Sequence, residues 1–188
     1  MNKIFVTDMD DVLVDLLSAW IRVLNFRYRK SVTTEQVKDW DMRLAYPDLT
    51  DKELYGVLNE DELWQQVKPK GDSAEYLKRI KDAGYDVFVC TATHYKNIGK
   101  KLTHCLLKYY PWLDYKDIIM CHNKAMINCQ FIVDDNPENM RNSRAVRFLM
   151  DCPHNQNADE SCYDYRVTSM KEVFDIVNEL EKVERIYV

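Results

Sequence analysis

Apolar residues fall at strand spacing at the start of the chain and at helical spacing directly after it. Residues 3–7 form a short apolar run that ends in acid, which is typical of a buried parallel strand opening into a site. Apolar positions then recur every three or four residues over 16–30, and Arg27 and Lys30 lie where cations favour a helix C-terminus. The pattern predicts one strand followed by one helix.

The next stretch contains two helix-start signals and no convincing strand. Thr33 with Gln36, and Thr50 with Glu53, have the capping-box form, in which each side chain satisfies a backbone amide of the other residue. We therefore predict a small helical cap over residues 16–69, inserted after the first strand.

Helix and strand alternate strictly from Gly71 onward. Capping and terminating residues mark a helix from Asp72 to Gly84 and a last helix from Met170. The other predicted elements are strands at 86–90, 117–121, 130–133 and 146–150, and helices at 96–110 and from Pro137. This alternation requires right-handed crossovers. It predicts an α/β fold, a doubly wound parallel sheet covered on both faces, built from residues 1–15 and 70–188.

The composition favours a small molecule as partner. A formal charge of −5 over 188 residues leaves no long basic surface for nucleic acid polymers or anionic membranes. No apolar run approaches membrane-spanning length, and residues 1–6 lead into a strand rather than a signal peptide, so we expect a cytoplasmic protein. The six cysteines are scattered without a CxxC pair. We expect reduced thiols and no zinc site.

Charged and hydroxyl side chains lie at or near the carboxyl ends of the predicted strands, which is where doubly wound sheets bind ligands. In chain order they are Asp8, Asp10, Thr91, Lys124, Asp134 and Asp135. Crowded carboxylates repel one another unless they share protons or hold a cation, and Mg²⁺ prefers oxygen ligands. The sequence therefore predicts a Mg²⁺ site whose candidate ligands are Asp8, Asp10, Asp134 and Asp135.

The same residues suit phosphoryl transfer through a covalent intermediate. Asp8 would attack the phosphate once the cation has neutralised the repulsion between two anions. Asp10 would protonate the leaving oxygen and later activate a water. Thr91, the adjacent Ala92 and Lys124 would bind the phosphate, with Lys124 balancing its charge.

Taken singly, each of these residues has an ordinary structural explanation, such as a turn or a solvated surface lysine. Their order along the chain carries the prediction. The stretches are 8–13 (DMDDVL), 87–91 (VFVCT), Lys124 and 132–135 (IVDD). In this order they resemble the four motifs of the haloacid dehalogenase-like phosphatases, a superfamily with a Rossmann-like core.

Within that superfamily the chain looks most like the cytosolic and mitochondrial 5′(3′)-deoxyribonucleotidases and their small bacterial or phage relatives. The support is FVCT at 88–91, the stretch 124–137 with its Asp-Asp-x-Pro ending, and CPHNQ at 152–156, which is similar to the family's Cys-His-Asn-Gln segment. The resemblance implies Mg²⁺-dependent hydrolysis of deoxynucleoside monophosphates and a homodimer. It also implies cap aromatics that pack on the base, for which Trp40 and Trp64 stand at matching positions. Packing of the cap's own core is the alternative for both.

Three departures from the family pattern leave the base preference open: Asp11 where Gly is frequent, Ala92 where the animal enzymes have Ser, and Leu16 where an aromatic is expected. Another phosphorylated metabolite as substrate, transfer to an acceptor other than water, and an inactive metal-binding module also stay open. A cysteine phosphatase is disfavoured because Lys96 stands where Arg must follow Cys90. A P-loop is excluded because the four glycines form no phosphate loop.

Overall fold

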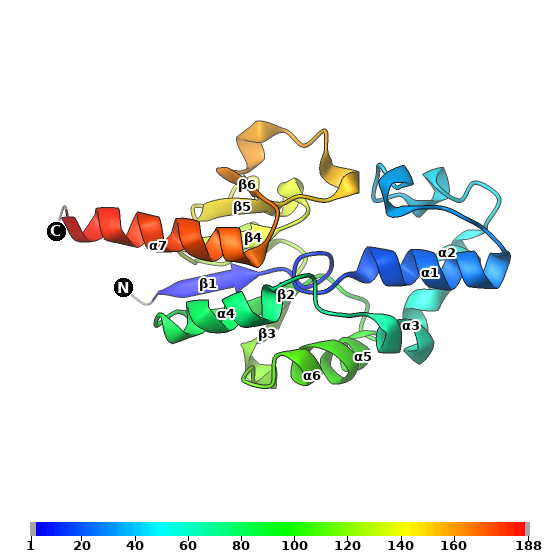
Figure 1. The fold of residues 1–188 in the computed structure, drawn as a ribbon, viewed down its shortest axis with the longest axis horizontal. Helices are drawn as coiled ribbons and strands as arrows, with labels where there is room; N and C mark the ends of the chain where they lie inside the picture. The colour runs from blue at the N-terminus through cyan, green and yellow to red at the C-terminus, as the bar shows by residue number, and fades with distance from the viewer. Residues whose placement is uncertain (1–2, 187–188) are drawn as a thin grey trace.

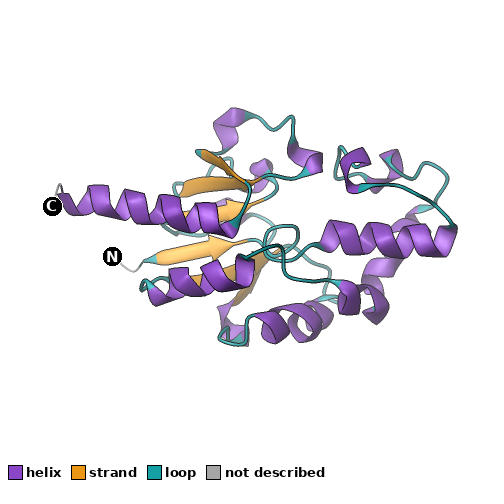
Figure 2. Cartoon of the chain, viewed as in Figure 1, coloured by secondary structure: helices purple, strands orange, loops and turns teal. Residues whose placement is uncertain are grey.

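A six-stranded, all-parallel sheet forms the centre of the molecule in a computed structural model that describes residues 3–186 (Figures 1 and 2). The strand order is β3-β2-β1-β4-β5-β6. The strands are β1 Ile4–Thr7, β2 Asp86–Thr91, β3 Ile118–Met120, β4 Phe131–Asp134, β5 Val146–Met150 and β6 Tyr165–Val167. The predicted doubly wound α/β fold is confirmed. Strand β6 was not predicted, because three residues are too few to show a period of two.

The α-helices lie in the insertion after β1 and around the sheet. They are α1 Leu16–Tyr28, α2 Asp51–Gly56, α3 Asp61–Gln66, α4 Ser73–Asp82, α5 Ile98–Lys100, α6 Leu107–Tyr109 and α7 Met170–Ile186. Both predicted capping boxes form, although Thr33 opens only a 3₁₀ turn while Thr50 opens α2. The predicted helix 96–110 is interrupted, because a π-helical segment, Lys101–Leu106, joins α5 to α6.

The two faces of the sheet are covered differently. Phe5, Val89 and Phe131 belong to a large core that also includes apolar residues of α4 and α7, which lie side by side across this face (Figure 1). Val6 and Ile132 point the other way into a smaller core. Right-handed crossovers on the β4-β5-β6 side run over that second face. They are short, and among the described residues they contain only 3₁₀ turns, Lys124–Met126, Pro137–Asn139, Pro153–Asn155 and Glu160–Cys162.

The order of the strands reverses between β1 and β4, and such a point is where doubly wound sheets bind ligands. Thr7 of β1 pairs with Val133 of β4, so the next residues, Asp8 just after β1 and Asp134 at the end of β4, lie side by side. The amide of Asp8 donates to the carbonyl of Val133 at 2.8 Å. The register thus places two predicted site carboxylates together.

The segment 16–69, which we call the cap segment, lies beyond the carboxyl ends of the strands (Figure 1). The chain leaves the core and returns to it along paired backbone, since Val14 forms an antiparallel bridge with Pro69. The Asp15 amide donates to the Lys68 carbonyl at 2.9 Å. The six cysteines are free. Within residues 3–186, no helix has the length and apolar character needed to cross a membrane.

Candidate active site

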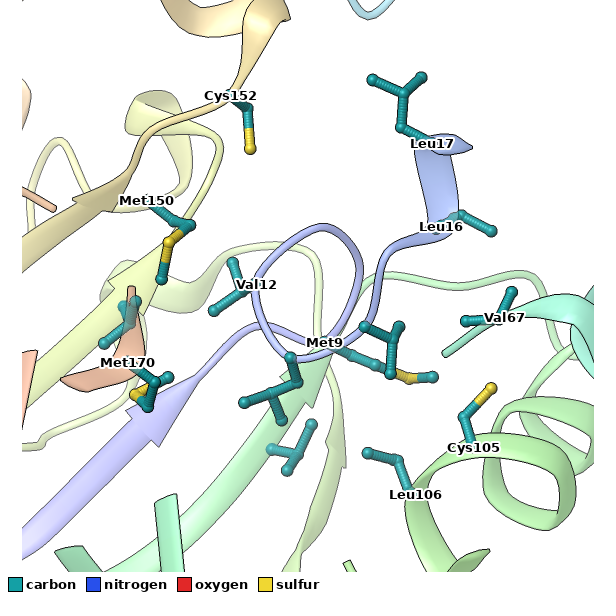
Figure 3. Packing of buried hydrophobic residues seen from close by; sticks show 14 of the residues in the cluster. Met9, Val12, Leu16, Leu17, Val67, Cys105, Leu106, Met150, Cys152 and Met170 are labelled. Atoms are coloured by element: carbon teal, nitrogen blue, oxygen red, sulfur yellow. The ribbon is translucent and has the colours of Figure 1, made fainter. Parts of the chain in front are cut away.

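The loop after β1 directs apolar side chains into the core and acidic ones toward a cavity. Figure 3 shows Met9 and Val12 pointing into the packed interior, Met9 on the side of Cys105, and both are at most 1% exposed. Asp11 between them has φ 54°, in the left-handed region that Gly, Asn and Asp tolerate best. Its carboxylate accepts a hydrogen bond from the Leu17 amide at 2.9 Å, at the start of α1. The loop therefore accommodates the acidic residue that stands where the family often has Gly.

Lys124 lies between Asp8 and Asp134 in the interior. Its Nζ donates to Oδ1 of Asp8 and, at 2.6 Å, to Oδ2 of Asp134. Burial opposes the charged form of Lys124, but the two carboxylates outweigh it and raise the pKa of this ammonium above its usual range. Lys124 is therefore a fixed positive charge in contact with the predicted nucleophile.

Asp8, Asp134 and Asp135 each bring a carboxylate oxygen within 4.8 Å of the others. Burial raises the pKa of Asp134 and of Asp135 to about 7, and the nearby carboxylate of Asp8 adds to the rise in both. Lys124 only partly offsets it. An all-oxygen donor set with surplus negative charge fits a hard divalent cation such as Mg²⁺.

Further side chains orient the last two carboxylates of this group. Nδ2 of Asn139 donates to both carboxylate oxygens of Asp134, at 3.1 and 3.2 Å. Nε2 of His154 lies 2.7 Å from Oδ2 of Asp135, and Nδ2 of Asn155 donates to the Asp135 carbonyl at 2.7 Å. His154 and Asn155 belong to the segment CPHNQ, and through them this segment holds Asp135 in place. The sequence pattern alone predicts no role for that segment.

Asp10 lies apart from the three-carboxylate group. Its Oδ2 accepts a hydrogen bond from Lys101, whose Nζ also donates to the Thr91 hydroxyl at 2.9 Å. Burial raises the pKa of Asp10 although Lys101 acts to lower it. Among the described residues, the Asp10 carboxylate is not one of the three that lie within 4.8 Å of one another, and its place among the metal ligands stays a prediction. A raised pKa suits a general acid.

A cavity of about 290 Å³ lies between the sheet and the cap segment. Its polar wall contains Asp8, Asp10, Lys124 and Asp135, and Ala92 lies on it as well. Its apolar wall comes from the cap segment and consists of Leu16, Leu17, Trp20, Val37, Trp40, Met42 and Leu58. The volume is close to the lower end of small-molecule pockets, about 300 Å³. A ligand with an anionic end and a planar apolar end matches these two walls.

The two tryptophans predicted to contact the base lie in different surroundings. Trp40 is on the cavity wall, 44% exposed, with its ring centroid 4.7 Å from that of His154. Trp64 is 1% exposed and does not line the cavity; its indole nitrogen donates to the Leu58 carbonyl at 2.8 Å. The structure therefore retains Trp40 as a candidate base contact and places Trp64 in the packing of the cap segment.

The chain is similar to a family model and to curated relatives over most of its length. A family model described as "5' nucleotidase, deoxy (Pyrimidine), cytosolic type C protein" matches residues 2–183. The 5'(3')-deoxyribonucleotidase of Clostridium acetobutylicum is 29% identical over 153 residues, which is 80% of this chain and 82% of that protein. The 5'(3')-deoxyribonucleotidase of Bacillus subtilis is 29% identical over 158 residues, 84% of this chain and 90% of its own.

Solved structures share the fold at low sequence identity. A hydrolase of the haloacid dehalogenase family from Deinococcus radiodurans, with bound phosphate and sodium, has a TM-score of 0.66 at 15% identity and covers 95% of this chain and 96% of its own. A haloacid dehalogenase-like hydrolase from Streptococcus pneumoniae has a TM-score of 0.66 at 11% identity, covering 94% and 98%.

Proposed function

Since the chain belongs to the cytosolic-type 5′ nucleotidase family and is a phosphatase of haloacid dehalogenase-like fold, we propose that it hydrolyses deoxynucleoside monophosphates through a phosphorylated Asp8. The observation that carries the proposal is the group of Asp8, Asp134 and Asp135, with Lys124, at the base of a cavity whose opposite wall is apolar and aromatic. The polar wall suits a phosphate, and the apolar wall suits a planar base.

In the first step, a carboxylate oxygen of Asp8 attacks phosphorus and the bond from phosphorus to the ester oxygen breaks. Lys124 holds Oδ1 of Asp8, and no hydrogen bond among the described residues engages Oδ2, which is therefore the attacking atom. Asp10 gives its proton to the departing ester oxygen, so that the nucleoside leaves as an alcohol.

In the second step, water attacks the phosphorus of phospho-Asp8, and Asp10 takes a proton from that water. The phosphorus–oxygen bond to Asp8 breaks, which releases phosphate, restores the Asp8 carboxylate and leaves Asp10 protonated for the next cycle. Asp10 can serve both steps because it lines the cavity and Asp8 does too.

The residues present fit a magnesium ion. Asp8, Asp134 and Asp135 would hold it, with Asn139 and His154 fixing the orientation of the last two. When bound, Mg²⁺ would neutralise the charge that otherwise keeps a phosphate away from a carboxylate.

We expect Mg²⁺-dependent phosphate release to be selective for deoxynucleoside monophosphates over ribonucleotides and sugar phosphates. The measurement is phosphate release across these substrates, with EDTA to remove the cation and Asp8→Asn as the inactive control. Turnover of sugar phosphates alone would leave the phosphatase chemistry in place and remove the nucleotide assignment. Full activity in EDTA would contradict the cation site.

Replacing Trp40 by Ala should lower kcat/KM for a deoxynucleoside monophosphate by about tenfold, since stacking of a base on an aromatic side chain contributes roughly 1–3 kcal/mol. The same variant should hydrolyse deoxyribose 5-phosphate, which has no base, at the wild-type rate. Phe26→Ala, at an aromatic residue of α1 that is 86% exposed and outside the cavity, is the matched control. Equal losses on both substrates would show that Trp40 does not contact the base.

A further inference from the structure

Lys101 is a buried ammonium that the sequence analysis did not consider. It is the first residue of the π-helical segment and is 2% exposed. Its Nζ contacts the Asp10 carboxylate, donates to the Thr91 hydroxyl, and lies 5.4 Å from the ring centroid of Trp64. A carboxylate, a hydroxyl and an indole face thus surround one positive charge.

The contact with Lys101 leaves the two oxygens of Asp10 in different surroundings. Oδ2 is held by Lys101, whereas Oδ1 is buried and has no hydrogen-bond partner among the described residues. Because Asp10 also lines the cavity, Oδ1 is the atom left free to exchange a proton with a bound substrate. A buried, unpaired carboxylate oxygen costs free energy, and such costs are typical of functional sites.

A contribution to stability alone does not explain the buried ion pair between Lys101 and Asp10. Replacing such a pair by apolar side chains is often neutral or stabilising, so an apolar residue in the helix would serve the fold as well. The π-helical geometry is also uncommon, and it is frequent at functional sites. The ring of Trp64, from the cap segment, lies over the buried Lys101 ammonium.

We propose that Lys101 is a positioning residue that fixes Asp10 for its two proton transfers and that, through its donation to Thr91, leaves the Thr91 hydroxyl hydrogen free to point at the phosphate. This inference rests on the proposed phosphatase mechanism. In this arrangement Trp64 packs on Lys101 and not on the base. Through this contact the cap segment is linked to Asp10, the general acid.

The test compares two leaving groups in Lys101→Met. A nucleoside alkoxide needs a proton from Asp10, whereas p-nitrophenolate leaves without one. For both substrates kcat/KM reports the formation of phospho-Asp8. We expect Lys101→Met to lower kcat/KM for the nucleotide on the order of a hundredfold, the usual size of a general-acid contribution, and that for p-nitrophenyl phosphate by only about threefold.

The double variant gives a second readout. Because Lys101 acts through Asp10, adding Lys101→Met to Asp10→Asn should cost little more than Asp10→Asn alone on the nucleotide. Lys100→Met is the matched control, since Lys100 is the neighbouring residue and pairs with the exposed Asp61 at 3.0 Å; it should behave as wild type.

Equal losses on the two substrates, or additive losses in the double variant, would overturn the inference. If Lys101→Met does not fold, Lys101→Gln is measured instead; failure of both to fold would show that the pair is purely structural. A wild-type protein that hydrolyses neither substrate, or an active Asp8→Asn, would remove the proposed function itself. A wild-type protein that hydrolyses both while Lys101→Met loses both equally would remove only this inference.

Discussion

Asp8→Asn should reduce phosphate release from deoxynucleoside monophosphates by on the order of 10⁴-fold or more, as loss of the nucleophile does in other covalent enzymes. The amide has nearly the size of the carboxylate but cannot form the phosphorylated intermediate. The fold should survive, because Lys124 keeps Asp134 as a partner and one of three mutually repelling carboxylates is removed.

Two measurements check this result: phosphate release under saturating Mg²⁺, and thermal unfolding of the variant beside the wild type. Asp86→Asn is the control, because Asp86 is exposed at the start of β2, at the opposite end of the strand from the site. Retention of most of the activity would remove Asp8 as the nucleophile. If Asp8→Asn did not fold, the loss of activity would not report on the chemical step, and Asp8 would have a structural role.

Lys124→Met should lower both activity and stability. Removing one partner of a buried ion pair typically costs about 3–5 kcal/mol because the other charge stays buried without compensation. Here the variant leaves Asp8 and Asp134 facing each other with no ammonium between them. Loss of a fixed positive charge at the phosphate should also lower kcat by roughly 10²–10³-fold.

Binding of Mg²⁺ provides a second test of the Lys124→Met prediction. If Asp8, Asp134 and Asp135 bind Mg²⁺, the ion replaces part of the missing charge, so Mg²⁺ should raise the Tm of Lys124→Met by more than it raises the wild-type Tm. Lys116→Met, at an exposed lysine, is the control and should show the wild-type response. An equal rise in Tm for wild type and Lys124→Met would contradict a cation site beside Lys124.

The carboxylates at the strand ends could be predicted because their signal is local. Asp8 directly follows an apolar run, Asp134 is the last residue of another, and parallel strands present their carboxyl ends at one edge. The sequence pattern does not show that β1 and β4 are neighbours, and only the register of Thr7 with Val133 brings oxygens of the two acids within 4.8 Å of each other. The order of the motifs predicts which residues form the site, and the order of the strands explains why these residues meet.

Lys101 was not predicted because a single lysine in a helix usually points to solvent. A weak signal was present, since Lys101 is one turn before the buried Cys105 and so shares the apolar face of the predicted helix. For Trp64 the sequence left base contact and cap packing open for a similar reason: it shows a large aromatic residue in the cap but does not show which way it faces. Contacts of this kind depend on distant segments, and spacing along the chain does not reveal them.

The paired backbone at Val14 and Pro69 brings the exit of the chain into the cap segment and its return to the core to one place. Both of its ends sit at one place on the core, directly beside the loop that carries Asp10 and Asp11, so lengthening, shortening or exchanging the segment need not alter the register of any strand. Substrate range and reaction chemistry can therefore change at different rates in evolution. A changed cap segment can place a different apolar wall over the same carboxylates. It must still supply a side chain that covers Lys101.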